Sequence, residues 1–179
     1  MAKKSSFSSS GFLFCFLFLL AGAGCGYRPA GQASRLPANV KVIAIPAFQN
    51  QTTWMRLEQR LTTAVMEEFI HRTRYRITSA EEEADAVLTG KVLSATTAPV
   101  LFDPSTGRAS AVQVTVTVAV ELRDRQSQAV LYANPNYIFR EQYEITGDVA
   151  SFFEEREPAL DRLARDFATT LVSAVLENF

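Results

Sequence analysis

Strict alternation of side-chain type over twelve residues is the feature that most constrains the fold. From Val112 to Arg123, apolar residues alternate with mostly polar ones. The apolar residues are Val112, Val114, Val116, Val118, Val120 and Leu122. Successive side chains of a strand point to opposite faces of its sheet, so this pattern predicts a long strand with one buried and one exposed face. Such two-faced strands are typical of antiparallel sheets.

The first 24 residues predict an export segment rather than part of the fold. Lys3 and Lys4 precede the apolar run Phe12–Leu20, and small residues then lead to Cys25. A cationic start, a short apolar run and a small-residue end are typical of a secretory signal. The run is shorter than the roughly 20 residues of a spanning helix.

Small residues directly before a cysteine resemble a bacterial lipobox. Cleavage after Gly24 would then leave Cys25 as a lipidated first residue, carrying acyl chains such as palmitate. An ordinary secretory signal with a chance cysteine remains the alternative. Residues 25–38 are rich in Gly, Pro, Ala and Ser and are interpreted as a flexible tether of at most about 45 Å. Residues 39–179 then form a single domain.

The rest of that domain predicts two helices and further strands. A β-branched run, Val40–Pro46, predicts a buried strand, and apolar residues at helical spacing from Trp54 to Phe69 predict a helix capped by Thr52 or Thr53. A short strand at 75–78 and a capped turn at 79–85 follow. A strand at 86–97 has Gly90 as a possible bulge, and a turn is expected within 99–108.

The C-terminal part predicts one more strand and one more helix. A strand is expected within 129–145, and an apolar stripe from Leu160 to Phe179 predicts a helix that starts at Pro158 after a separate turn. The order of elements indicates an α+β fold. Its two helices lie on one face of a mostly antiparallel sheet.

Catalytic and metal chemistry find little support in the sequence. The chain of 179 residues contains one His and two Cys, one of them in the export segment, and no phosphate loop or nucleophile elbow occurs. His71 and Glu81–Glu83 are interpreted as surface residues, and Asp85 as a local cap. We therefore expect neither an enzyme nor a cofactor or metal site. A formal net charge of −1 also argues against a nucleic-acid partner.

Several segments together resemble the lipopolysaccharide-assembly lipoprotein family, LptE. They are the lipobox-like start, Val42–Thr52, Leu57–Thr62, Ala84–Gly90 and the opening of the last helix around Ala159–Ala164. The resemblance implies two helices on a four-stranded sheet and no catalytic residues. It also implies an outer-membrane protein, held by its lipid anchor, that plugs the barrel LptD and helps deliver lipopolysaccharide to the outer leaflet. Such a protein faces the periplasm or lies inside the barrel lumen.

Other envelope lipoproteins share the pattern of the first half. These include activators of penicillin-binding proteins and components of curli secretion, and they remain the alternative function. Because the net charge is slightly negative, contact with an anionic glycolipid requires a local basic patch. Arg123 and Arg125, at the end of the long strand, are the candidate lipopolysaccharide contacts, with Arg108 at its other end as the weaker one. Solvated edge charges are the competing interpretation of all three.

Overall fold

The computed structural model describes residues 36–145 and 149–177, and for residues 149–154 it describes the backbone alone. Export segment, Cys25 and most of the expected tether lie outside this range. The elements run in the order β1 (Val42–Ala44), β2 (Gln49–Asn50), α2 (Leu57–Arg72), β3 (Arg76–Thr78), η1 (Glu81–Glu83), β4 (Ala86–Phe102), β5 (Ala109–Asp124), β6 (Val130–Glu144) and α3 (Val149–Glu177).

One sheet of six strands carries the fold, which corrects the expected four-stranded, mostly antiparallel arrangement. The strand order is β3-β1-β4-β5-β6, and β2 pairs with β4 beside β1. Pairs β4–β5 and β5–β6 are antiparallel, whereas β1 runs parallel to both β3 and β4, and β2 parallel to β4. Strands β1, β2 and β3 have only two or three residues each, too few for a sequence pattern to show their partners.

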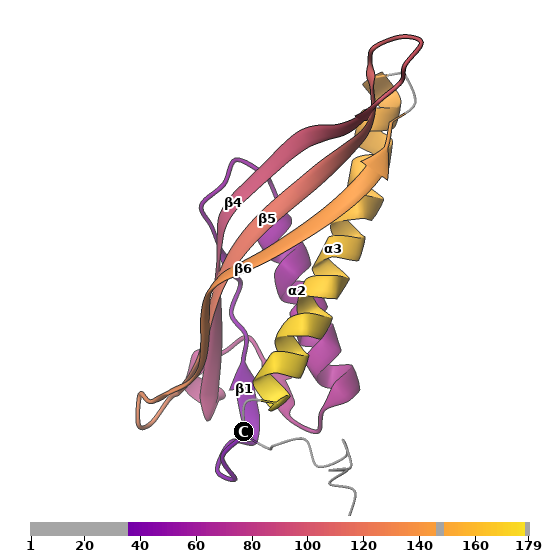
Figure 1. Cartoon of the computed structure of the whole chain (residues 1–179). Helices are drawn as coiled ribbons and strands as arrows, with labels where there is room; N and C mark the ends of the chain where they lie inside the picture. The colour runs from indigo at the N-terminus through magenta and orange to yellow at the C-terminus, as the bar shows by residue number, and fades with distance from the viewer. Residues whose placement is uncertain (1–35, 146–148, 178–179) are drawn as a thin grey trace, which may run out of the picture. The chain divides into compact units, whose positions relative to one another are not determined.

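The long strand predicted from alternation is confirmed as β5, at the centre of the three long strands in Figure 1. Its even-numbered residues from Val112 to Leu122 are buried, and the odd-numbered ones between them are partly exposed. Strand β4 is longer than expected, since it continues to Phe102 by pairing with Ala109 of β5. The turn is accordingly confined to 103–108.

Helices α2 and α3 cover the buried face of the sheet and run parallel to each other. Arg60, near the start of α2, forms ion pairs with Glu157 and Asp161 of α3. Near the end of α2, Arg72 donates to Ser173 Oγ at 2.7 Å. Residues about twelve positions apart on α2 therefore meet residues about twelve positions apart on α3, which fixes the relative direction and register of the helices.

The sequence predicts a cap on α2 at Thr52 or Thr53, but neither threonine caps the helix. The residue before the helix is Arg56, with φ 64° and no capping side chain. Asn50 organises the preceding loop instead: its side chain accepts from Thr52 N at 2.8 Å and donates to Trp54 O and to Glu58 Oε2, both at 2.7 Å. Thr52 Oγ1 donates to Asn50 Oδ1 and accepts from Trp54 N within the same loop, so it does not cap the first turn of α2.

Pro158 lies inside α3 and not at its beginning, which corrects the expected break. The helix begins at Val149 and continues through Pro158 to Glu177. Proline removes one backbone hydrogen bond in a helix interior. Pro158 itself is exposed on the solvent side of α3.

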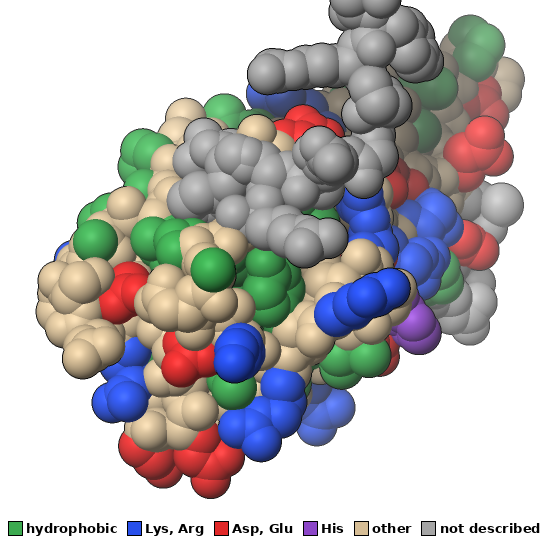
Figure 2. All heavy atoms as spheres, turned by 90° about the horizontal axis from the view of Figure 1, so that it is seen from below, with side chains coloured by type: hydrophobic (Ala, Val, Ile, Leu, Met, Phe, Trp, Pro, Cys, Tyr) green, Lys and Arg blue, Asp and Glu red, His purple; other side chains and the backbone are tan. Residues whose placement is uncertain are grey.

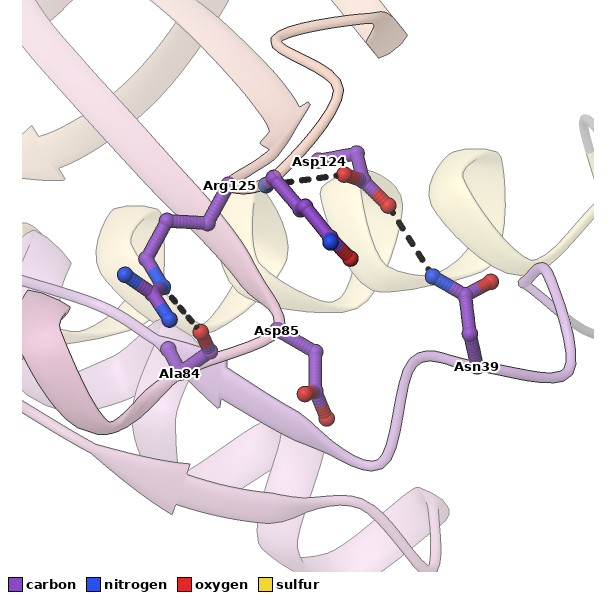
Figure 3. Close-up of a pocket in the computed structure, with 6 residues that line it drawn as sticks. Asn39, Ala84, Asp85, Asp124 and Arg125 are labelled. Carbon is purple, nitrogen blue, oxygen red and sulfur yellow. Dashed lines mark hydrogen bonds between the residues drawn. The ribbon is translucent and has the colours of Figure 1, made fainter.

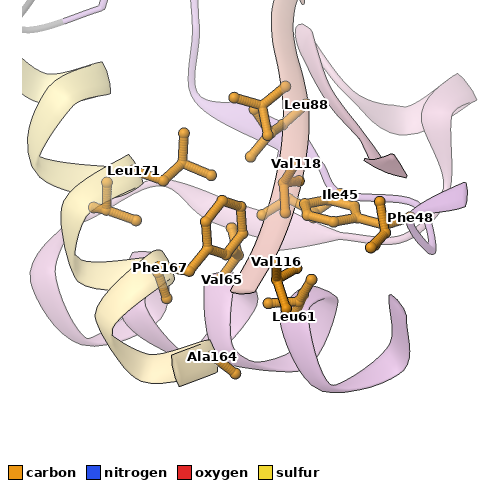
Figure 4. Close-up of a cluster of buried hydrophobic side chains, with 14 of the residues drawn as sticks. Ile45, Phe48, Leu61, Val65, Leu88, Val116, Val118, Ala164, Phe167 and Leu171 are labelled. Carbon is orange, nitrogen blue, oxygen red and sulfur yellow. The ribbon is translucent and has the colours of Figure 1, made fainter. Parts of the chain in front are cut away.

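Phe167 lies in the middle of the core between the helices and the sheet (Figure 4). Its ring meets the rings of Phe48, Tyr137 and Phe139 edge-on, with centroids 5.3–6.3 Å apart. The apolar stripe predicted for the last helix is confirmed as far as Val175 by burial of Leu160, Leu163, Ala164, Leu171 and Val175. Its last expected member, Phe179, lies outside the described residues.

The sequence suggests a bulge at Gly90, but this residue stays in register opposite Val120. A β-carbon at this position would stand 2.5 Å from the Phe48 ring, so the glycine makes room for that ring. The register of β4 against β5 shifts further along, first between Val92 and Ser94 and again between Pro99 and Phe102.

Candidate functional site

The candidate basic residues Arg123 and Arg125 lie where β5 ends, beside a tight turn built on Asp124. The carboxylate of Asp124 accepts from Gln126 N at 3.0 Å, from Ser127 N at 2.8 Å and from Ser127 Oγ at 2.9 Å. Its other oxygen accepts from Asn39 Nδ2 at 3.1 Å. Asp124 therefore serves the turn and does not form an ion pair with either arginine.

Asp85 makes a second set of bonds close by, at the start of β4. Its Oδ2 accepts from Lys41 N at 2.8 Å and from Val42 N at 2.9 Å. Asp85 therefore caps the start of β1 from 43 and 44 positions away, and the expected local cap is wrong. Its backbone carbonyl accepts from Arg125 N at 2.8 Å. The beginnings of β1 and β4 and the end of β5 are thus joined at one place.

A polar depression of about 360 Å³ opens at this junction (Figure 3), lined by Asn39, Ala84, Asp85, Asp124, Arg125 and Gln126. Hydrogen bonds hold the pKa of Asp124 below its ordinary value, first from the Ser127 backbone, then from the Ser127 hydroxyl and Asn39. The backbone N–H groups of Lys41 and Val42 likewise lower the pKa of Asp85. Both carboxylates are therefore ionised at neutral pH, and the depression mixes negative groups with one guanidinium.

The two arginines differ in how far their guanidinium groups are already engaged. Arg123 Nε donates to Glu121 Oε1 at 2.8 Å and its Nη1 to Gln128 O at 2.8 Å. Arg125 donates from Nε to Ala84 O at 2.6 Å, and its two terminal nitrogens form no hydrogen bond with the described residues. Arg125 is thus held in place with its terminal donors available, which suits a phosphate better than the neutralised Arg123.

Arg108 lies at the other end of β5, in the β4–β5 hairpin. The turn there is built like the one at Asp124: Asp103 Oδ1 accepts from Ser105 N at 2.7 Å and from Thr106 N at 3.1 Å. Arg108 directly precedes β5 and Arg123 lies near its end, fifteen positions further along, which is about 50 Å at the usual rise per residue. A single glycolipid headgroup cannot contact both ends, so the candidate residues form two separate places.

A hydrogen bond to Asn39 also distinguishes these two places. Asn39, close to the first described residue, is bonded to Asp124. The first described residues therefore lie at the end of β5 that carries Arg125, and not at the end next to Arg108. Sequence reasoning missed Asn39, and an isolated asparagine before a strand carries no signal of a partner 85 positions away. Cys25 itself lies outside the described residues.

No patch of one charge sign dominates the surface seen from below in Figure 2, where basic and acidic side chains are both present. Within residues 36–145 and 149–177, no three His, Cys, Asp or Glu side chains converge as a metal site would require. In the same described part of the chain, no helix is long and apolar enough to cross a membrane.

Known structures share this fold at low sequence identity. An uncharacterised lipoprotein B from Nitrosomonas europaea has a TM-score of 0.55 and 16% identity, with 84% of this chain and 90% of that chain covered. A PelC dodecamer from Paraburkholderia phytofirmans gives a TM-score of 0.50 and 15% identity, with 80% and 92% covered. No curated protein matches the chain in sequence.

The family assignment comes from the sequence of the domain itself. Residues 40–175 match the family LptE, described as lipopolysaccharide-assembly. This range begins just before β1 and ends two residues before the end of α3, so the match covers the whole described sheet, all of α2 and nearly all of α3. The chain therefore belongs to the lipopolysaccharide-assembly family LptE.

Proposed function

We propose that this protein is an outer-membrane lipoprotein that plugs the barrel LptD, supports its assembly and helps deliver lipopolysaccharide to the outer leaflet. The family match over residues 40–175 is the observation that carries the proposal. Cys25 holds the protein on the membrane through its acyl chains, and residues 25–38 connect this anchor to the domain. Several acyl chains together are enough for stable anchoring without a spanning helix.

The role is structural, with no catalytic step. The carboxylates of the polar depression, Asp85 and Asp124, are occupied by backbone and side-chain donors that fix the strand ends. A general acid or base needs an ionisable group available to a substrate, and these two groups are committed to the fold.

Direct contact with lipopolysaccharide, in this proposal, runs mainly through Arg125. Its terminal nitrogens are available, and two donors on one guanidinium can grip a phosphate together. Arg123 contributes less because Glu121 already neutralises it, and Arg108 offers a second, distant contact. Arg125 directly follows Asp124, which is hydrogen-bonded to Asn39 near the first described residue.

Co-purification from outer membranes in a mild detergent tests the partner. The tagged full chain should recover a large β-barrel in near-equal amount, identified by mass spectrometry. Recovery of a cell-wall synthase or a curli pore in place of the barrel would contradict the proposal and favour the other envelope functions.

Acyl labelling tests the lipid anchor. Cys25→Ser should abolish acyl labelling of the chain, and labelling that persists would place the anchor elsewhere.

A further inference from the structure

The face of the sheet turned away from the helices has an unusual composition where β4, β5 and β6 lie side by side. The strand register places three cross-strand rows there, which we call the outer sheet face: Ser94–Thr117–Ile138, Thr96–Thr115–Arg140 and Ala98–Gln113–Gln142. These rows alternate with the buried residues of β5, so they point away from α2 and α3.

Charge is nearly absent from this face. Between Lys91 and Glu121 the charged residues are Asp103 and Arg108, and both belong to the hairpin turn. On β6 the first charged residue is Arg140, which is the one charge in the three rows. The chain as a whole is 21% charged, so its charges are concentrated elsewhere.

The solvent side of the helices provides the contrast. On α3, the exposed residues Asp161, Arg162, Arg165 and Asp166 carry charge, and the exposed Thr169 and Thr170 that follow do not. On α2, Glu67, His71 and Arg72 are likewise exposed. The exposed side of the helices therefore carries more charge than the outer sheet face, and this difference needs a physical reason.

Charged residues are depleted from the buried centre of protein interfaces because removing a charge from water is costly. A hydroxyl or amide can both donate and accept a hydrogen bond, and threonine loses little side-chain freedom on burial. Sheets pack face to face at about 10 Å. The inner wall of a large outer-membrane barrel is itself a polar sheet. A neutral, hydroxyl-rich sheet face fits such a wall better than a charged helix pair does.

We propose that the outer sheet face is the surface that packs against the inner wall of the barrel, an inference that rests on the function proposed above. Thr115 and Thr117 lie at its centre, flanked by strands on both sides. Lys91 and Arg140 lie toward its margin. The helix side, in this arrangement, faces the water-filled remainder of the lumen.

Site-specific photo-crosslinking in cells tests which face meets the barrel. A photoreactive amino acid replaces Thr117 on the outer sheet face or, as the matched control, the exposed threonine Thr63 on α2. The barrel should be captured at position 117 and at least about tenfold less at position 63. Capture at 63 alone, or equally at both positions, would overturn the face assignment and leave the proposed function intact. Absence of the barrel from both, in cells where the tagged chain does not co-purify with it, would remove the proposed function itself.

A charge placed in the same rows gives an independent measurement. Thr96→Arg and Thr117→Arg introduce a cation between neutral neighbours and should reduce barrel co-purification by about tenfold or more, because the new charge would be buried without a partner. Thr117→Ser and Thr63→Arg should leave it unchanged. Thermal unfolding of each variant shows whether the domain is folded. Full barrel recovery with a folded Thr117→Arg variant would overturn the inference.

Discussion

The ring of Phe48 lies directly over Gly90, with no room for a β-carbon on the strand beneath it. This contact joins the loop before α2 to β4, and Phe48 is further held because its N–H donates to Thr62 Oγ1 of α2 at 3.0 Å. Phe48 also meets Phe167 of α3. Phe48 therefore connects the sheet with both helices, through its ring to Gly90 and Phe167 and through its backbone N–H to Thr62.

Gly90→Ala should lower the free energy of unfolding by about 1–3 kcal/mol, the usual cost of overpacking a filled core. Urea unfolding followed by circular dichroism measures it. Gly107→Ala is the matched control: a β-carbon there would meet open space, so the cost is limited to about 1–2 kcal/mol of backbone strain at φ 66°. A Phe48→Leu change should recover part of the loss in the Gly90→Ala protein and none in the Gly107→Ala protein. Additive effects in both backgrounds would contradict the contact as the cause.

Phe167→Ala should be the most damaging single core change, with a loss of about 3–5 kcal/mol. The side chain is fully buried and meets three other aromatic rings, so its removal leaves a cavity that the surrounding rings cannot fill. Thermal unfolding of the variant provides the measurement. A loss below that of a single buried methyl group, about 1 kcal/mol, would show that the helices repack freely over the sheet.

Arg60→Ala should weaken the attachment of α2 to α3 by only about 1 kcal/mol, because its ion pairs with Glu157 and Asp161 are partly exposed. Raising the salt concentration should reduce the difference between this variant and the parent protein, since screening weakens exposed ion pairs. Arg165, exposed on α3, is a suitable control position for alanine. An equal effect at both positions would argue against the ion pairs as the source.

Acid should destabilise the domain through Asp85 and Asp124. Their pKa values in the folded protein lie below the ordinary value of 3.8 that they regain on unfolding. Their contribution is therefore fully present above about pH 4 and is lost as pH falls through the folded pKa values. Melting temperature measured from pH 7 to pH 3 should fall at the acid end, and Asp124→Asn should flatten that fall while lowering the melting temperature at pH 7. An unchanged acid slope in this variant would contradict the assignment.

The sequence predicted best where one pattern runs over many residues. Alternation from Val112 to Arg123 was sufficient for β5, and helical spacing was sufficient for the core face of α3. The parallel pairing of β1 with β3 depends on α2 connecting them and on Asp85 capping β1, neither of which a three-residue strand reveals. At Pro158 the local pattern was misleading, since proline normally begins or breaks a helix. Helix α3 instead continues through Pro158, because a helix of 29 residues remains stable without one backbone hydrogen bond.

The candidate site was predicted in part. Arg123, Arg125 and Arg108 were placed correctly at strand ends, since the strand itself was clear. Their different engagement was beyond the sequence: Glu121 lies two positions from Arg123 on the same strand face and pairs with it, whereas Arg125 reaches Ala84 across 41 positions. Contacts of that kind depend on the register of distant strands, which local patterns do not encode.

Lipopolysaccharide binding by the purified, detergent-solubilised lipoprotein separates the three arginines. Arg125→Gln should weaken binding severalfold and reduce its dependence on salt, because a bidentate charge-assisted contact is lost. Arg123→Gln should have a smaller effect, since its guanidinium is already paired with Glu121. Arg74→Gln, at an exposed position after α2, is the control. Equal affinity for the Arg125→Gln variant and the parent protein would exclude Arg125 as a contact and leave a plug without lipid recognition at this place.

Depletion of this protein in its own bacterium, followed by measurement of newly made lipopolysaccharide at the cell surface, tests the central claim most directly. The account predicts that surface lipopolysaccharide falls as the protein is lost, that newly made lipopolysaccharide accumulates inside the cell envelope, and that the intact chain restores delivery. Normal surface delivery after full depletion, together with altered cell-wall synthesis, would contradict it.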